Sequence, residues 1–199
     1  MLKASLALQQ NRKQLVQAKL VFYFFIASLA MFFAAMLISY CVIRMQAFQQ
    51  INRDYLALQI PFSFWISTLF LVVTSAFLQG AVWMVRRQRM EGFRKCLKAA
   101  LWSCMLFIAT QIFGMHSLLA VHFTQIDGST KLYGLCFTLS VVHALHVIGG
   151  LAYIVYVLIQ SNRGKYDHER HWAVDHCAGY WHFLDVVWMA MLVTFVLAR

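Results

Sequence analysis

The stretch AGYWHFLDVVWMAMLVTFVLA, residues Ala178–Ala198, is apolar enough to cross a membrane, yet it carries His182 and Asp185. An aspartate deep in a bilayer costs roughly 3 kcal/mol on insertion scales, so such a residue faces other helices or a polar cavity. His182 comes three residues before Asp185 on the same helical face, with Trp181 and Trp188 beside them. We therefore expect this face to point into the protein.

The composition is that of an integral membrane protein. The 199 residues leave room for one domain, and a hydrophobic fraction of 62% with 12% charged residues excludes an ordinary soluble domain. The formal charge of +10 comes from Lys and Arg in short flanks beside apolar spans, so membrane topology explains it better than a nucleic-acid partner. The five cysteines are scattered without a CxxC pair, so neither a zinc site nor a disulfide framework is expected.

The fold class predicted from hydropathy is all-α, an integral membrane bundle of five transmembrane helices. A helix needs about 20 mostly apolar residues to cross a hydrocarbon core of about 30 Å. Five stretches meet this requirement: residues 20–43, 60–85, 99–123, 132–159 and 178–198. Residues 1–19 are interpreted as a basic cytoplasmic flank, and residues 20–199 as one five-helix domain.

The distribution of Lys and Arg predicts the orientation of the bundle. Thirteen of these residues lie in the amino-terminal flank and in the second and fourth connections, whereas four lie on the opposite side of the expected spans. Positive residues are enriched in cytoplasmic segments. The amino terminus is therefore predicted to lie inside and the carboxyl terminus outside.

Two oddly composed blocks carry a family resemblance. They are YWHFLDVVW, residues 180–188, and HALHVIGG, residues 143–150. Together they resemble subunit III of the haem-copper terminal oxidases, in the five-helix bacterial type that lacks the first two helices of the seven-helix form. The residues of this chain that carry the signature are His143, His146, Gly149, Gly150, Trp181, His182 and Asp185.

The resemblance extends to the first and third spans, with one departure. Gln111 matches a glutamine that the family carries in the middle of the membrane, and the stretch IASLAMFFAAMLISYCVIR, residues 26–44, matches the family's corresponding helix. Members usually carry a carboxylate directly after the serine of this stretch, where this chain has Leu29. Roles that depend on that carboxylate, such as lipid contacts and support of proton uptake, are therefore not carried over to this chain.

The resemblance implies an accessory subunit of a respiratory terminal oxidase in a bacterial plasma membrane. Such a complex reduces O₂ to water and pumps protons, with its haem and copper in other subunits, so no catalytic residue, metal ligand or redox cofactor is expected here. The implied partners are catalytic subunit I, subunit II and phospholipids, and the implied work is to stabilise the catalytic subunit during turnover. Arg86, Arg87 and Lys98 suit lipid phosphates. The electron donor, cytochrome c or a quinol, stays open.

The histidines keep another class of function open, a small haem-binding cytochrome. His116, His143 and His182 are the candidate axial ligands. The remaining histidines away from the signature blocks are expected in a solvated fourth connection or at a span end; they are His122, His168, His171 and His176. A further alternative is a subunit III-like component of a nitric oxide reductase, which shares the fold and differs in its partner.

Counting the rise of the helices from the expected span ends places the polar residues in two layers. Asp185 and His182 are expected at the depth of Tyr153 and Leu29, and Gln111 at the depth of His146. We interpret these groups first as buried hydrogen bonds that hold helices in register. Such bonds in membranes average only about 0.6 kcal/mol, so they specify packing more than they stabilise the bundle. Burial opposes ionisation of Asp185 and a charged His182 favours it, so its charge stays open.

Overall fold

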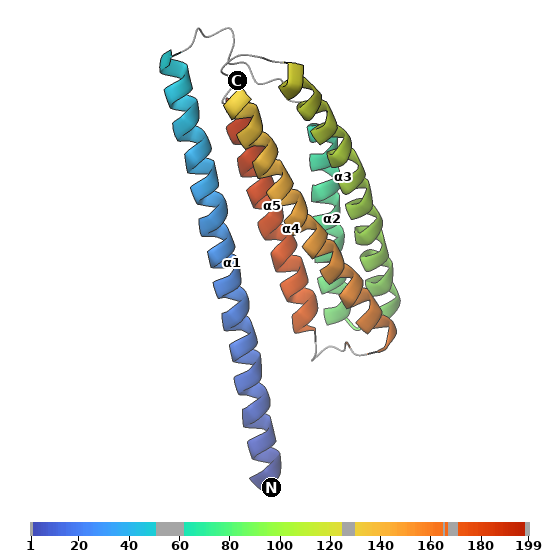
Figure 1. The fold of residues 1–199 in the computed structure, drawn as a ribbon. Helices are drawn as coiled ribbons and strands as arrows, with labels where there is room; N and C mark the ends of the chain where they lie inside the picture. The colour runs from blue at the N-terminus through green and yellow to red at the C-terminus, as the bar shows by residue number, and fades with distance from the viewer. Residues whose placement is uncertain (1, 51–61, 125–129, 165, 167–170, 198–199) are drawn as a thin grey trace. The chain divides into compact units, whose positions relative to one another are not determined.

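The chain folds into five helices, each with a segment long and apolar enough to cross a membrane (Figure 1). The computed structural model describes residues 2–50, 62–124, 130–164, 166 and 171–197. The helices are α1 (Leu2–Gln50), α2 (Ser63–Arg86), α3 (Met90–Thr124), α4 (Thr130–Asn162) and α5 (Trp172–Leu197). No strand occurs within those ranges, so the prediction of an all-α, five-helix membrane protein is confirmed.

The helices extend beyond the spans expected from hydropathy. Helix α1 begins at Leu2, α3 begins at Met90 instead of residue 99, and α5 begins at Trp172 instead of residue 178. Hydropathy marks the part of a helix that can lie in hydrocarbon, whereas the helix itself continues through polar residues of good helix propensity. Asp175 and His176, expected in the fourth connection, therefore lie in the first turns of α5.

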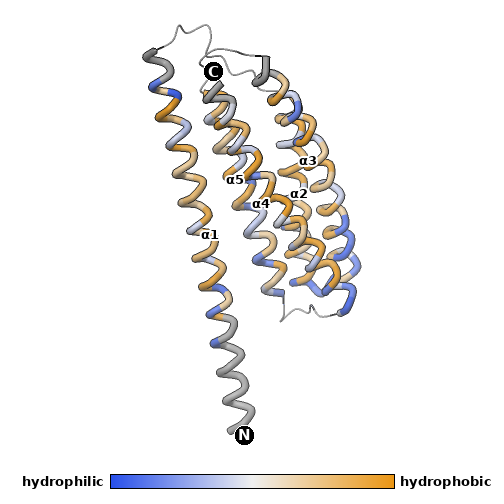
Figure 2. Tube along the Cα trace, in the orientation of Figure 1, coloured by the Kyte–Doolittle hydropathy of each residue, from blue (hydrophilic) through white to orange (hydrophobic). Residues whose placement is uncertain are grey.

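The chain divides into two compact units, Met1–Ala35 and Met36–Arg199. The first unit is the amino-terminal part of α1, where the large apolar side chains of Val21, Phe24 and Met31 are exposed. Leu29 lies within this unit. The second unit contains the end of α1 and the four helices α2 to α5, whose apolar middles and more polar ends Figure 2 shows.

Within the second unit, α2 and α3 form an antiparallel pair joined by a short turn. Gln88 in this turn has a φ of 60°, and the Arg89 amide donates to the carbonyl of Met84 at 3.0 Å. A Cβ on Gly92 would meet the Met84 sulfur at 3.0 Å, so the glycine lets α3 start close beside α2. We call the end of the bundle with this turn the turn end, and the opposite end the far end.

The centre of the bundle is aromatic. Trp188 of α5 is fully buried and makes edge contacts with Phe64 of α2 at 5.5 Å and Phe107 of α3 at 6.2 Å between ring centroids. Tyr40 in the last part of α1 contacts Phe195 of α5 at 5.3 Å. Large apolar side chains also cover the outside of these helices, as expected for surfaces that face lipid or other membrane helices; examples are Trp102, Phe113 and Val186.

Candidate functional site

The two signature blocks pack directly against each other, residues 143–150 on α4 and residues 180–188 on α5. The Trp181 indole N–H donates to the carbonyl oxygen of Gly150 at 3.3 Å, and a Cβ on Gly150 would lie 3.1 Å from the indole ring. The Tyr180 hydroxyl donates to the carbonyl oxygen of His146 at 2.9 Å. The small residue at position 150 thus lets the backbone of α4 approach a tryptophan ring.

His143 occupies the far end of this contact. Its imidazole is fully buried and stacks on Trp188 with centroids 5.2 Å apart and an interplanar angle of 28°. The Phe107 ring is nearly perpendicular to the imidazole, with the two ring centroids 6.5 Å apart. One face of the imidazole is therefore occupied by an indole, and the residue acts as part of the aromatic centre.

His182 and Asp185 belong to a second polar group, the Asp185 cluster, formed with Ser75 and Gln79 of α2. Ser75 Oγ lies 2.6 Å from His182 Nδ1, and Gln79 Oε1 lies 3.1 Å from His182 Nε2. A neutral imidazole with its proton on Nε2 satisfies both contacts, because it donates to the amide oxygen and accepts from the hydroxyl.

Asp185 joins this cluster through Ser75 and makes no hydrogen bond to His182. Its Oδ2 lies 4.0 Å from His182 Nδ1, beyond hydrogen-bond distance, and its buried Oδ1 has no hydrogen-bond partner. The His182–Asp185 pair considered from sequence therefore lies at the outer limit of ion-pair distance, and the hydrogen bonds of His182 go to α2.

The depths expected for several polar residues are wrong. His143 lies beside Trp188 and Gly150 against Trp181, so in this antiparallel pair His146 is level with Asp185 and Tyr153 is two turns nearer the turn end. The error arises because α5 begins six residues earlier than expected, which moves Asp185 about 9 Å deeper.

Gln111 and His146 do not form the expected layer either. Gln111 is buried in α3 and accepts a hydrogen bond from Ser67 of α2 at 3.0 Å. His146 Nδ1 lies 2.7 Å from the carbonyl oxygen of Val142 in its own helix. Each residue is thus engaged with a different element, and Gln111 links α3 to α2.

The turn end holds an ion-pair group that sequence reasoning missed. Asp175 in the first turn of α5 accepts from Arg86 of α2 at 3.1 Å and lies 3.3 Å from His171 Nε2. Two sequence signals could have found this group. Asp175 is an acid in the first turn of a helix, where the helix macrodipole favours negative charge, and His171 comes four residues earlier. Arg86 therefore joins α2 to α5 as well as facing the surface.

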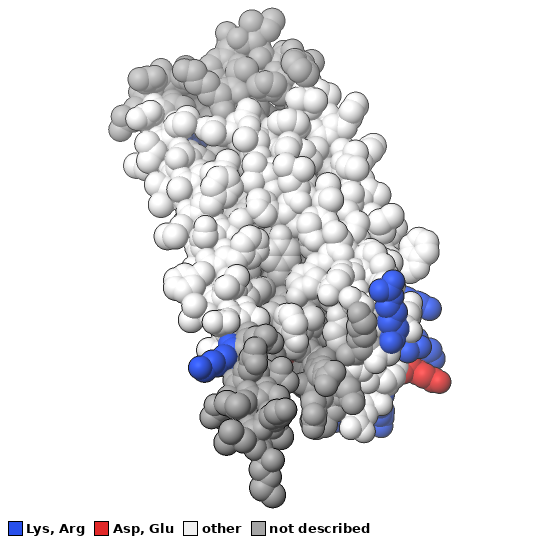
Figure 3. Space-filling view, turned by 60° about the horizontal axis from the view of Figure 1, so that its bottom comes forward, with Lys and Arg blue, Asp and Glu red and all other residues white. Residues whose placement is uncertain are grey.

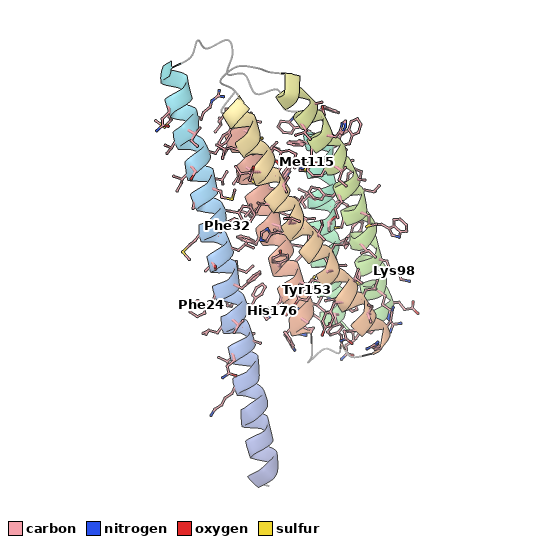
Figure 4. The ribbon with its side chains drawn as sticks, viewed as in Figure 1. Phe24, Phe32, Lys98, Met115, Tyr153 and His176 are labelled. Atoms are coloured by element: carbon pink, nitrogen blue, oxygen red, sulfur yellow. The ribbon has the colours of Figure 1, made fainter. Side chains whose placement is uncertain are left out.

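The other basic residues of the turn end are exposed. Figure 3 shows Lys and Arg side chains gathered there, and the exposed ones on α2, the turn and α3 are Arg86, Arg87, Arg89, Arg94, Lys95 and Lys98. The Arg87 guanidinium lies 3.7 Å above the ring of Trp83. Lys98 extends outward from α3 (Figure 4). This is the arrangement of an aromatic and basic membrane interface.

Tyr166, in the connection after α4, packs its ring edge-on to Phe93 at 6.3 Å. Burial raises the pKa of Tyr166 to about 12, with smaller contributions from Tyr156 and Cys177. The phenol therefore stays neutral and covers the turn end of α3.

The candidate haem ligands lie at different depths. His143 is level with Phe107 of α3, and His116 is nine residues further along α3, about 13 Å toward the far end. His182 is level with Gly149, six residues and about 9 Å from His143 toward the turn end. A haem bridging two helices needs ligands at matched depth, which these three residues do not provide.

Two other described histidines, His171 and His176, lie apart from any group that could hold a metal ion. His176 lies on α5 with its ring edge-on to Trp172 at 5.6 Å, and His171 faces Asp175. His168 and the side chain of His122 lie outside the described residues. Across the part of the chain that is described, no three His, Cys, Asp or Glu residues come together in a way that could hold a metal ion.

Comparison with known proteins gives a consistent result. The family model for cytochrome c oxidase subunit III matches residues 6–198. A probable cytochrome c oxidase subunit 3 of Nocardia farcinica is 30% identical over 191 residues, which cover 95% of this chain and 91% of that protein. Another of Mycobacterium tuberculosis is 29% identical over 133 residues, 66% of this chain and 64% of the relative. The cytochrome c oxidase subunit 3 of Synechocystis sp. is 28% identical over 130 residues, 64% and 53% of the two chains.

Proposed function

The chain belongs to the cytochrome c oxidase subunit III family, and we propose that it is the accessory subunit III of a respiratory haem-copper terminal oxidase. The complex reduces O₂ to water and pumps protons, with haem and copper in catalytic subunit I and subunit II. Subunit III stabilises the catalytic subunit from its flank. Its membrane is the bacterial plasma membrane, with the amino terminus inside.

The observation that carries this proposal is that the signature residues pack helices against one another. Gly150 and Trp181 bring α4 and α5 together, and His143 stacks on Trp188 in the aromatic centre. These residues therefore build a rigid bundle and leave apolar outer faces for lipid and neighbouring helices. Such a chain supports chemistry in a partner.

Phospholipid binding is the second part of the proposal. Arg87 above Trp83 places positive charge beside an aromatic ring at the turn end, and Lys98 adds a second exposed basic side chain on α3. Basic residues at this depth attract anionic lipid headgroups by about 1 kcal/mol each. Arg86 is partly engaged by Asp175, so we assign it the smaller share of the lipid contacts.

Purification of the intact complex through a tag on this chain tests the proposal. The expected result is co-purification of two further subunits that carry the haem and copper, identified by mass spectrometry and metal analysis. The separated chain should show no Soret band. A haem bound to the separated chain would overturn the accessory role, and the catalytic subunit of a nitric oxide reductase as partner would overturn the assignment to an O₂-reducing complex.

A further inference from the structure

Two buried polar side chains near the aromatic centre each carry one polar atom without a hydrogen-bond partner. Gln111 of α3 is 2% exposed and Ser140 of α4 is fully buried. Neither the Gln111 amide nitrogen Nε2 nor the Ser140 hydroxyl has a hydrogen-bond partner in the protein. Buried polar groups are almost always paired with protein or with ordered water, and in a membrane span no bulk water is available.

The two side chains lie at the same depth on neighbouring antiparallel helices. Phe107 of α3 contacts His143 of α4, which fixes how the two helices face each other. Gln111 comes four residues after Phe107, and Ser140 comes three residues before His143. Each is therefore about one helical turn, roughly 5 Å, from this contact and on the far-end side of it. They are level with each other to within about one residue's rise of 1.5 Å.

Ser140 also differs from six other hydroxyl side chains of the spans. Six of them donate to a carbonyl three or four residues earlier in their own helix; they are Ser67, Thr68, Thr74, Thr110, Thr138 and Thr194. This local bond is the common way for a hydroxyl to be satisfied inside a membrane helix. Ser140 does not use it, so its hydroxyl is available to a group outside its own helix.

The orientation of the Gln111 amide is set by α2. Its Oε1 accepts from Ser67, which leaves the two N–H groups on Nε2 for a different acceptor. The side chains next to this level include the neutral aromatic groups Phe107 and Trp188, which offer no charge to an ion. Gln111 Nε2 and Ser140 Oγ therefore require a small neutral molecule that can both accept and donate a hydrogen bond.

We propose that a single water molecule is bound between Gln111 and Ser140, inside the α2–α3–α4 part of the bundle. It accepts a hydrogen bond from Gln111 Nε2 and exchanges one with Ser140 Oγ, which gives it the two polar partners that a buried water needs. Together with the Ser67–Gln111 bond, this water completes a polar bridge from α2 through α3 to α4.

A cryo-EM map of the intact complex, at a resolution that shows ordered waters, tests the proposal. The expected result is a peak within about 3 Å of both Gln111 Nε2 and Ser140 Oγ. Ser140→Ala should abolish or weaken the peak. Ser103→Ala is the matched control and should leave it unchanged, because the buried Ser103 hydroxyl already donates to the Phe70 carbonyl at 2.9 Å.

Three outcomes would overturn the site. The first is a direct hydrogen bond between Gln111 and Ser140, with no water peak between them. The second is a Ser140 hydroxyl that donates to the Cys136 carbonyl of its own helix, again with no water peak. The third is a water peak that is unchanged in Ser140→Ala. The wild-type map decides between the first two and the proposal on its own, so the test does not depend on assembly of the variants.

Discussion

The imidazole of His182 has a partner at each ring nitrogen, and both partners come from α2. Ser75 and Gln79 lie 2.6 and 3.1 Å away, whereas the Asp185 carboxylate lies 4.0 Å away. Sequence spacing identified Asp185 as a neighbour within ion-pair distance and missed the two hydrogen-bond partners, because a separation of three residues guarantees a shared face and not a hydrogen bond. The histidine is therefore one of the residues that tie α5 to α2, beside the Arg86–Asp175 ion pair, and Asp185 makes no hydrogen bond to it.

We predict that His182→Leu weakens the folded bundle more than Asp185→Asn does. Loss of the imidazole removes two hydrogen bonds to α2, worth together about 1 kcal/mol if each contributes the average of about 0.6. Asp185→Asn keeps the side-chain volume and leaves the Ser75–His182–Gln79 bonds intact. The measurement is the free energy of unfolding in mixed micelles. A loss in Asp185→Asn equal to that in His182→Leu would show that the carboxylate, and not the imidazole, holds this face.

At the scale of elements, the antiparallel contact between α4 and α5 depends on one close approach. Gly150 is the point where a side chain cannot be added without moving the Trp181 ring, since a Cβ would come within 3.1 Å of it. Gly149 on the neighbouring position has more room, because a Cβ there would lie 3.8 Å from the Tyr180 hydroxyl. The HALHVIGG block is thus a packing surface with a single tight position.

Gly150→Ala should destabilise the bundle, and Gly134→Ala on the same helix is the control. Overpacking of a well-packed interface costs typically about 1–3 kcal/mol, which exceeds the gain of about 1 kcal/mol from replacing a helical glycine by alanine. A Cβ on Gly134 meets nothing within 4 Å, so that variant should be as stable as the wild type or more so. Equal stability of both variants in a denaturant titration would mean that Trp181 moves aside without cost.

The elements themselves were predictable, and their relative depths were not. Hydropathy found all five helices because each has a stretch long and apolar enough to cross hydrocarbon. The direct contact of the two signature blocks on α4 and α5 was not predicted. The helix starts at Met90 and Trp172 lie in polar sequence that hydropathy does not register. Every depth counted from the expected span ends was shifted accordingly. The bonds of Ser75 and Gln79 to His182 could not be predicted, because they depend on how α2 and α5 are aligned, and no local sequence pattern specifies that alignment.

At the scale of the whole molecule, charge is concentrated where the membrane surface should be. The exposed basic residues of α2, the turn and α3 gather at the turn end, and large apolar side chains cover the helices beyond it. Positive charge on this side favours retention in the cytoplasm during insertion. The orientation proposed from the sequence therefore places the turn end inside.

Site-directed labelling of intact cells tests this orientation. A single cysteine placed at Arg87, in a chain whose own five cysteines have been replaced, should be protected from a membrane-impermeant thiol reagent, and one placed after Arg199 should react. Permeabilised cells supply the control, since both positions should then be labelled. Reaction at position 87 with protection at the carboxyl terminus would reverse the proposed topology.

Deletion of the whole chain tests its role in the complex. A catalytic subunit that keeps its haem and copper retains the chemistry of O₂ reduction, so the initial rate of the complex without this chain should be close to that of the complete enzyme. The rigid α2–α5 bundle, held together by Trp181, Trp188 and the bonds of His182, is expected to act by covering and holding the flank of that subunit. Loss of this support should therefore appear as fewer turnovers before inactivation, measured as the decay of O₂ consumption at saturating donor.

Re-adding the purified chain should restore the lifetime of the complex. Re-adding the Gly150→Ala variant should restore it only in part if bundle rigidity is what the partner requires. Complete loss of initial activity in a haem-replete and copper-replete complex would instead assign this chain a direct part in the reaction.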